Sequence, residues 1–93
     1  MYEYLEGKIA EANPAYTVLE VNGVGYLLHT SLFTYSHLQD KSQAKIYTHL
    51  VVREDDQQLF GFSTKQERML FRSLVSVSGV GANTARLILS GYS

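Results

Sequence analysis

The chain has 93 residues, a formal net charge of −1 and 45% hydrophobic side chains, so it is long enough for one small domain, or for one domain and part of a second. Its composition is that of a folded protein, and a chain of this size is not expected to form a large catalytic cleft between domains. Proteins that neutralise phosphates over their whole surface are usually basic, so the charge balance excludes such a protein, and any contact with nucleic acid must be local.

The N-terminal residues do not resemble a secretory signal. Glu3 and Glu6 lie where such a signal would have a basic stretch before an apolar run. No apolar run approaches the length of a membrane span, and the chain has no cysteine for disulfides, thiolate metal sites or a nucleophile. We therefore expect a cytoplasmic protein without a membrane partner.

Two strands are predicted at the start of the chain. Residues 2–11 mix Tyr, Leu and Ile with polar residues. The Asn13-Pro14 pair ends this segment, because proline disfavours regular structure at and just before itself. Residues 16–21 alternate with a period of two, which is typical of a strand with two distinct faces.

A hairpin is predicted directly after the second strand. Asn22-Gly23 lies between two β-type runs, and both central residues of a type I′ turn need a positive φ. Residues 24–29 are therefore the return strand, in which Gly25 allows a bend or a bulge.

The period changes after residue 30. Ser31 can cap a short helix, because apolar residues follow it at roughly helical spacing as far as Leu38. Residues 44–52 and 57–62 are rich in β-branched, aromatic and leucine side chains and predict two more strands. The acidic run Glu54-Asp55-Asp56 separates them.

Residues 1–63 thus contain three strands, a helical segment and two further strands. This order predicts an OB-fold, a five-stranded Greek-key barrel. The fold class is mainly β with C-terminal helices, and an SH3-like barrel is the alternative.

Two helices are predicted in residues 64–93. Thr64 and Glu67 have the spacing of a capping box, in which the hydroxyl and the carboxylate each satisfy an orphan backbone amide. The second helix is expected over residues 83–90, with Gly91 as its cap, and an end so close behind a cap indicates that the natural chain continues. In the first helix, we expect one apolar face of Met69, Leu70, Leu74 and Val77 and one hydrated face of Glu67, Arg68 and Arg72.

The turn between the helices is Gly79-Val80-Gly81. Both glycines are predicted to allow left-handed dihedrals, and Gly81 has no side chain to cover the amides that open the second helix. Free N–H groups at the positive end of a helix dipole form an anion site, and a nucleic-acid phosphate is the expected anion. The alternative is an ordinary helix–turn–helix packing unit, in which the glycines serve only the chain reversal.

Five segments together resemble the N-terminal half of the RuvA family, bacterial proteins that bind four-way Holliday junctions and work with the RuvB motor in branch migration. They occur in the family's order and spacing, which is more specific than the hairpin alone. The segments are Val21–Tyr26, Thr48–Asp55, Leu59–Phe62, Lys65–Phe71 and Gly79–Gly91.

The resemblance implies an OB-fold that forms a tetramer core, as a homotetramer or an octamer, and a helical domain with two helix-hairpin-helix motifs that grip the junction arms. Residues 64–93 would be the first motif. The second motif and the domain that recruits a RuvB-type motor ATPase do not occur in these 93 residues. We therefore expect weak DNA binding by this chain and no engagement of the motor. A RuvC-type resolvase would join the full complex.

The hairpin departs from the family at two positions. Ala82 and Asn83 stand where relatives often have Pro and Lys, so a cation near the phosphate is lost, and Arg86 could restore only part of it. The residues predicted to bind DNA phosphates are Gly79, Val80, Gly81, Ala82, Asn83 and Arg86.

The acidic run matches the family's paired carboxylates, called an acidic pin. The resemblance places Glu54 and Asp55 at the centre of the tetramer, where carboxylates repel phosphates and help to separate strands. Asp56 adds a third acid. From the residues alone, the alternative is a solvated hairpin tip.

Two other functions stay open. The three acids could bind Mg²⁺ in a nuclease, although adjacent residues point in divergent directions and no further ligand is identifiable. The barrel could instead be a general single-strand binder that uses some of its seven tyrosines for stacking. We prefer binding without catalysis, and predict no catalytic residue, cofactor or metal site.

Overall fold

The computed structural model describes residues 2–91. Residue 1 and residues 92–93, with which the predicted barrel and helical segments begin and end, lie outside the described part. The chain forms five strands and three helices there: β1 (Tyr4–Ala12), β2 (Tyr16–Val21), β3 (Val24–His29), α1 (Leu32–Leu38), β4 (Gln43–Val52), β5 (Gln57–Phe62), α2 (Lys65–Val75) and α3 (Ala82–Leu89).

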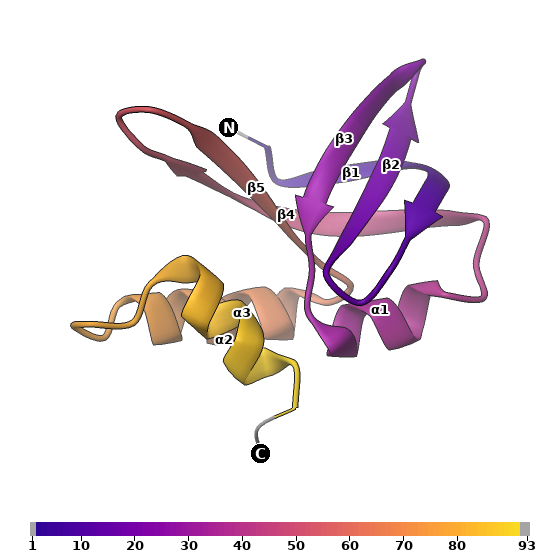
Figure 1. Ribbon diagram of the computed structural model, residues 1–93. Helices are drawn as coiled ribbons and strands as arrows, with labels where there is room; N and C mark the ends of the chain where they lie inside the picture. Colours follow the sequence, from indigo (N-terminus) through magenta and orange to yellow (C-terminus); the bar gives the residue numbers. More distant parts are fainter. Residues whose placement is uncertain (1, 92–93) are drawn as a thin grey trace.

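The strands close into a barrel in the order β1-β2-β3-β5-β4 (Figure 1). All neighbouring strands are antiparallel except β3 and β5, which pair in parallel at His29 and Phe60. The predicted hairpin between β2 and β3 is confirmed, because Asn22 has a φ of 51° and Gly23 a φ of 84°. The OB-fold predicted from the order of elements is therefore correct.

The β-bulge does not lie where the sequence suggested. Gly25 pairs regularly with Glu20, whereas the register shifts between Ile9 and Glu11 of β1. A bulge needs an extra residue in one strand, not a glycine, and nothing in the composition of β1 marks the position.

The barrel has its own apolar core, which α1 closes at one end. Leu19, Leu28 and Ile46 are fully buried, and Leu38 of α1 packs against them. The predicted cap of α1 is confirmed, since the Ser31 hydroxyl accepts a hydrogen bond from the amide of Thr34 at 3.2 Å.

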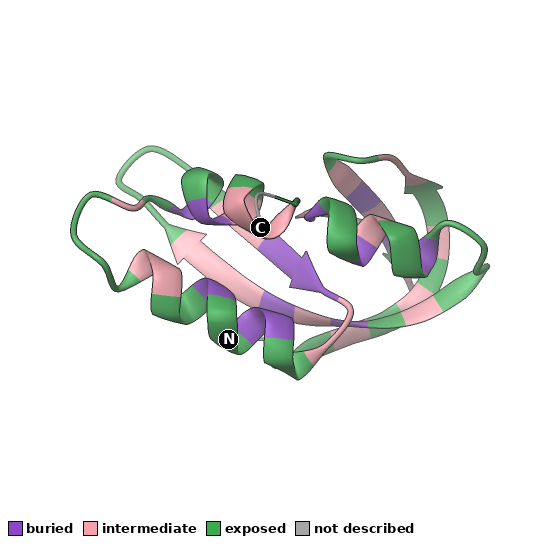
Figure 2. Cartoon of the chain, turned by 90° about the horizontal axis from the view of Figure 1, so that it is seen from below, coloured by how far each residue is buried: buried purple, intermediate pink, exposed green. Residues whose placement is uncertain are grey.

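A second apolar cluster joins the helix pair to the barrel. Phe71 of α2 is fully buried, and its ring centroid lies 4.9 Å from that of Phe62 and 5.2 Å from that of Phe60. Ala82 and Ala85 of α3 complete the cluster. In Figure 2, the buried residues of α2 lie along one side of the helix, in line with buried residues of β5.

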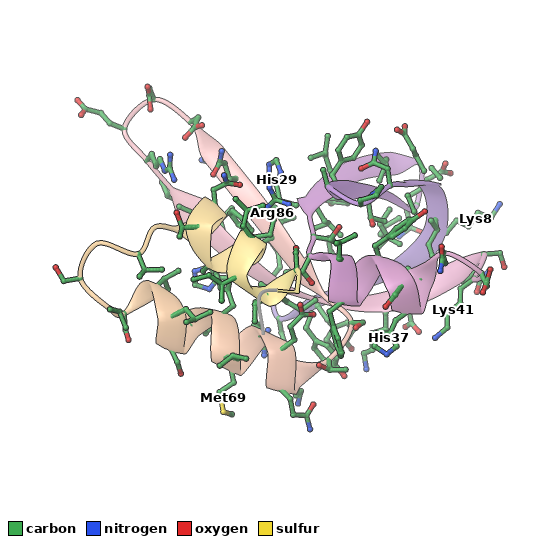
Figure 3. The ribbon with its side chains drawn as sticks, turned by 60° about the horizontal axis from the view of Figure 1, so that its bottom comes forward. Lys8, His29, His37, Lys41, Met69 and Arg86 are labelled. Atoms are coloured by element: carbon green, nitrogen blue, oxygen red, sulfur yellow. The ribbon has the colours of Figure 1, made fainter. Side chains whose placement is uncertain are left out.

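The predicted faces of α2 were correct for Arg72, which is exposed, and for Leu74, which packs against the apolar cluster, but wrong for most of the other residues. Glu67 and Arg68, expected in water, are each only 6% exposed, whereas Met69 is 69% exposed and Leu70 is 53% exposed. Figure 3 shows Met69 pointing away from the barrel. The inward side of α2 meets hydroxyl and carbonyl groups as well as apolar ones, so burial there follows hydrogen bonding rather than hydrophobicity.

The capping box at the start of α2 is only half formed. The Thr64 hydroxyl accepts from the amide of Glu67 at 3.0 Å, as predicted. The Glu67 carboxylate, however, accepts hydrogen bonds from the hydroxyls of Ser31 and Thr34, the latter at 2.5 Å. It therefore links α2 to the start of α1 instead of returning to its own helix.

Within residues 2–91, no helix has the length and apolar character needed to cross a membrane.

Candidate nucleic-acid interface

The turn between α2 and α3 leaves the start of α3 open. Gly79 has a φ of 87°, which is the left-handed region that favours glycine. Gly81, predicted to share that region, has a φ of −84° and a ψ of 172°, so this part of the prediction was wrong. Gly81 is extended because it is the N-cap of α3, a position that takes β-type dihedrals.

Gly81 has no side chain that could cover the start of α3. No side chain caps the first amides of α3, and a Cβ built on Gly81 would meet no heavy atom within 4 Å. The positive end of the helix dipole is therefore accessible, and its N–H groups have the geometry of an anion site. Val80 is half-buried against the apolar cluster and holds the turn in place.

The remaining predicted phosphate contacts on α3 differ from one another in orientation. Ala82 is 7% exposed and packs inward, so that only its backbone can serve a ligand. Asn83 is exposed, and its side-chain oxygen accepts two hydrogen bonds from Arg86, at 2.8 Å and 3.2 Å. The guanidinium of Arg86 also donates to the carbonyl of Thr30 at 3.2 Å, so Arg86 fastens α3 to the end of β3. Figure 3 shows Arg86 beside His29.

The acidic run lies at the tip of the β4–β5 hairpin, which extends beyond the barrel in Figure 1. Glu54, Asp55 and Asp56 are all exposed. The turn is closed by a backbone hydrogen bond from the amide of Arg53 to the carbonyl of Asp56, 2.8 Å long. Across residues 2–91, no three His, Cys, Asp or Glu side chains gather closely enough to hold a metal ion.

Two histidines near the helix–barrel contact are held neutral. Burial lowers the pKa of His49, and the charges of Arg72 and Arg68 lower it further. Arg72 donates from Nε to Nδ1 of His49 at 3.1 Å, which places the imidazole proton on Nε2. Burial, with a smaller effect of Arg86, also lowers the pKa of His29. Neither ring supplies a cation for DNA at neutral pH.

Two buried charged groups on α2 fix the angle between helix and barrel, and sequence reasoning missed both. Burial raises the pKa of the Glu67 carboxyl, and the hydrogen bonds from α1 oppose that rise. Arg68 donates to the Glu3 carboxylate at 2.8 Å and to the carbonyls of Glu3 and Thr48 at 2.8 Å and 3.1 Å. Only the Thr64-x-x-Glu67 spacing indicated a special role for Glu67, and it indicated a different partner.

The comparison with known families agrees with this barrel. The family described as the RuvA N terminal domain matches residues 1–61 of the chain. The chain belongs to the RuvA N-terminal domain family. The matched residues include β1 to β4, α1, the acidic hairpin and β5 as far as Gly61.

Similar curated proteins extend the likeness to the helix pair. The chain is 54% identical over 93 residues to a "Holliday junction branch migration complex subunit RuvA" of Bacteroides fragilis, with all of the chain and 46% of the relative aligned. Relatives with the same description from Christiangramia forsetii and Streptococcus gordonii are 50% and 49% identical, with 97% of the chain and 47% and 46% of the relatives aligned. The chain thus spans about half the length of the curated relatives it matches.

Proposed function

We propose that this chain binds four-way DNA junctions as the non-catalytic DNA-binding part of a branch migration complex in recombination and repair. One observation supports this most directly: an uncapped, unobstructed helix start at Gly81. It lies in a chain whose full length aligns with proteins named as Holliday junction branch migration complex subunits. A helix start of this kind binds phosphate without reading sequence, as recognition of a junction by shape requires.

In this proposal the barrel supplies the frame and the two exposed loops have different roles. Residues 79–83 and Arg86 hold the phosphates of one junction arm, the last of these chiefly by fixing α3 against the barrel. Glu54 and Asp55, with Asp56 as an extra acid, form the acidic pin at the centre of a homotetramer. Repulsion between these carboxylates and phosphates keeps the crossover open. A RuvB-type motor ATPase would supply the energy for migration, and a RuvC-type resolvase would act in the full complex.

The direct test is a gel-shift competition between a four-way junction, linear duplex and single-stranded DNA. We expect the junction to compete best. A preference for single strand would reject the junction proposal in favour of a general OB-fold binder, and metal-dependent cleavage of the junction would reject binding without catalysis.

A series of variants at Gly81 tests the anion site without harming the fold. Ala, Asn and Asp all tolerate the backbone of Gly81, and a Cβ meets open space there. Gly81→Ala should retain binding, Gly81→Asn should weaken it by covering the amides, and Gly81→Asp should weaken it most by adding a negative charge. Asn and Asp are good N-caps, so thermal stability should not fall. Equal DNA affinity of the Ala and Asp variants would mean that this helix start does not bind phosphate.

The acidic pin and the tetramer have separate tests. Replacing Glu54 and Asp55 by Gln and Asn should leave junction binding equal or tighter while changing the rate of branch migration by the full complex. Collapse of binding would contradict the repulsion argument. Light scattering should show four copies, because in a monomer the acidic loops have no common centre.

A further inference from the structure

Three cations gather around one tyrosine ring on the outer face of the barrel, near the start of α2. The ammonium group of Lys45 lies 4.1 Å from the ring centroid of Tyr4 and 5.9 Å from that of Tyr47. Lys65 and Arg68 approach the Tyr47 ring from α2, at 5.7 Å and 5.6 Å. Aromatic faces attract cations, but three like charges around one ring also repel one another.

Only one of these cations has an acidic partner. Arg68 pairs with Glu3 at 2.8 Å, and this is the only ion pair among residues 2–91. Lys45 lies opposite Glu6 in the β1–β4 register, yet its ammonium group is directed at the Tyr4 ring. The ammonium groups of Lys45 and Lys65 therefore remain exposed and without carboxylate partners.

A polar hollow continues this cationic surface toward the end of α1. The hollow has a volume of about 330 Å³, and Lys41 and Lys45 line it together with Gln43, Ser63 and Glu6. Figure 3 shows Lys41 near the end of α1 on that side of the molecule. The hydrogen-bonding groups that line the hollow would be available to a ligand that also contacts the exposed lysines.

The charge on this face differs from the rest of the chain. The chain has eight Lys and Arg residues and nine Asp and Glu residues. Four of the cations, Lys41 and the three around Tyr47, lie here with two carboxylates, Glu3 and Glu6. The rest of the chain has four cations and seven acids, one of which, Asp40, precedes Lys41 in the sequence. The Tyr47 side of the barrel is therefore a local positive surface on an otherwise acidic protein.

We propose that the Tyr47 face, defined as Lys41, Lys45, Tyr47 and Lys65, binds the phosphates of a nucleic-acid strand as a second contact, separate from the Gly81 helix start. The inference relies on the proposed function in taking nucleic acid as the ligand. A nucleic acid fits this surface better than an acidic peptide does. The Tyr4 ring, which is 46% exposed, can contact a base or sugar, while Lys45 beside it contacts a phosphate.

The first test compares the double variant Lys45→Gln/Lys65→Gln with the charge-retaining variant Lys45→Arg/Lys65→Arg and with Lys8→Gln, which removes an exposed lysine from outside the face. Affinity of the full 93-residue chain for a fluorescent four-way junction is measured over a range of salt. Each duplex phosphate contact that is lost should lower the slope of log affinity against log salt by about 0.9. The Arg variant and Lys8→Gln should keep the parent slope, and an unchanged slope in the Gln variant would overturn the proposal.

The second test separates this proposal from the proposed function. Amide NMR shifts of the chain are followed as the junction is added. Shifts at Lys45, Tyr47 and Lys65 that persist in Gly81→Asp support a second contact. Shifts confined to residues 79–83 overturn the Tyr47 face and leave the junction proposal intact, whereas no shifts at either surface overturn both. Tighter binding of poly-glutamate than of DNA at the Tyr47 face would show that it recognises an acidic protein segment instead.

Discussion

The buried carboxylate of Glu67 allows a sharp test of what holds the helix pair to the barrel. The hydroxyl of Ser31 donates to one carboxylate oxygen while accepting from the amide of Thr34. The hydroxyl of Thr34 donates to the other oxygen at 2.5 Å while accepting from the amide of Ser63 at 3.0 Å. Both hydroxyl protons therefore require an acceptor on residue 67.

Glu67→Gln keeps the shape of the side chain but offers only one acceptor oxygen. One of the two hydroxyl protons then has no partner, and a buried donor without a partner costs about 1–3 kcal/mol. The penalty should depend on pH. Burial raises the pKa of Glu67 in the folded protein above its ordinary value of 4.5, so the folded state binds more protons than the unfolded state over that interval.

A protonated carboxyl still has acceptor capacity on both oxygens, whereas the amide nitrogen of Gln can only donate. The advantage of Glu67 over Gln should therefore be largest well below pH 4.5, where the carboxyl is protonated in both states. It should decrease as the pH rises through the folded pKa, because the buried side chain must then ionise. Urea unfolding of both proteins at about pH 4 and pH 7.5 gives this difference, and the other titrating groups cancel in the comparison. A stability advantage of Glu67 that grows with pH would refute the reasoning, since it would mean that the two hydrogen bonds outweigh burial and lower the pKa.

Three further substitutions test other contacts, each by urea unfolding. Phe71→Ala removes a fully buried ring and should cost about 3–5 kcal/mol, whereas Phe71→Leu, which keeps most of the apolar volume, should cost less; unchanged stability of Phe71→Ala would mean that the cluster does not couple helix and barrel. A Cβ at Gly7 would lie 2.2 Å from a backbone carbonyl oxygen of β2, so Gly7→Ala should destabilise by more than about 2 kcal/mol, while Gly25→Ala, whose Cβ meets only ordinary contacts, serves as the control. Arg86→Leu should cost about 1 kcal/mol through loss of the hydrogen bond to Thr30; unchanged stability would show that Arg86 does not fasten α3 to the barrel.

Local sequence signals were sufficient to predict the strands and the closed barrel that they form. The Asn22-Gly23 pair determines a turn through the dihedrals that its two residues must adopt. The period of two in the sequence of β2 matches its burial, because successive side chains of a strand point to opposite faces. Thr17 and Leu19 point into the core, while their neighbours do not. Such features depend on residues close together in the chain, and the sequence contains them completely.

The errors arose where the partner of a residue is distant in the chain. The sequence predicted an exposed Glu67 because the residue is charged. Its hydrogen-bond partners, Thr34 and Ser31, lie 33 and 36 residues away in the chain, at the start of α1. Arg86 stays a predicted phosphate contact, and its additional partner, the carbonyl of Thr30, was missed because no pattern in the sequence indicates that the two groups lie within reach. For Gly81, the residue type was informative but the dihedral was not, since an N-cap and a left-handed turn both favour glycine.

The parallel pairing of β3 with β5 has a mechanical consequence. The barrel is closed there by a single residue pair, His29 and Phe60, so this seam has far fewer backbone hydrogen bonds than any other junction between its strands. The helix pair lies against the same seam, with Phe71 against Phe60 and Arg86 bonded to the residue after His29. A pulling force on the β4–β5 hairpin would therefore act on the strand pair with the fewest backbone hydrogen bonds. We expect the contacts of α2 and α3 beside this pair to help keep β3 and β5 together.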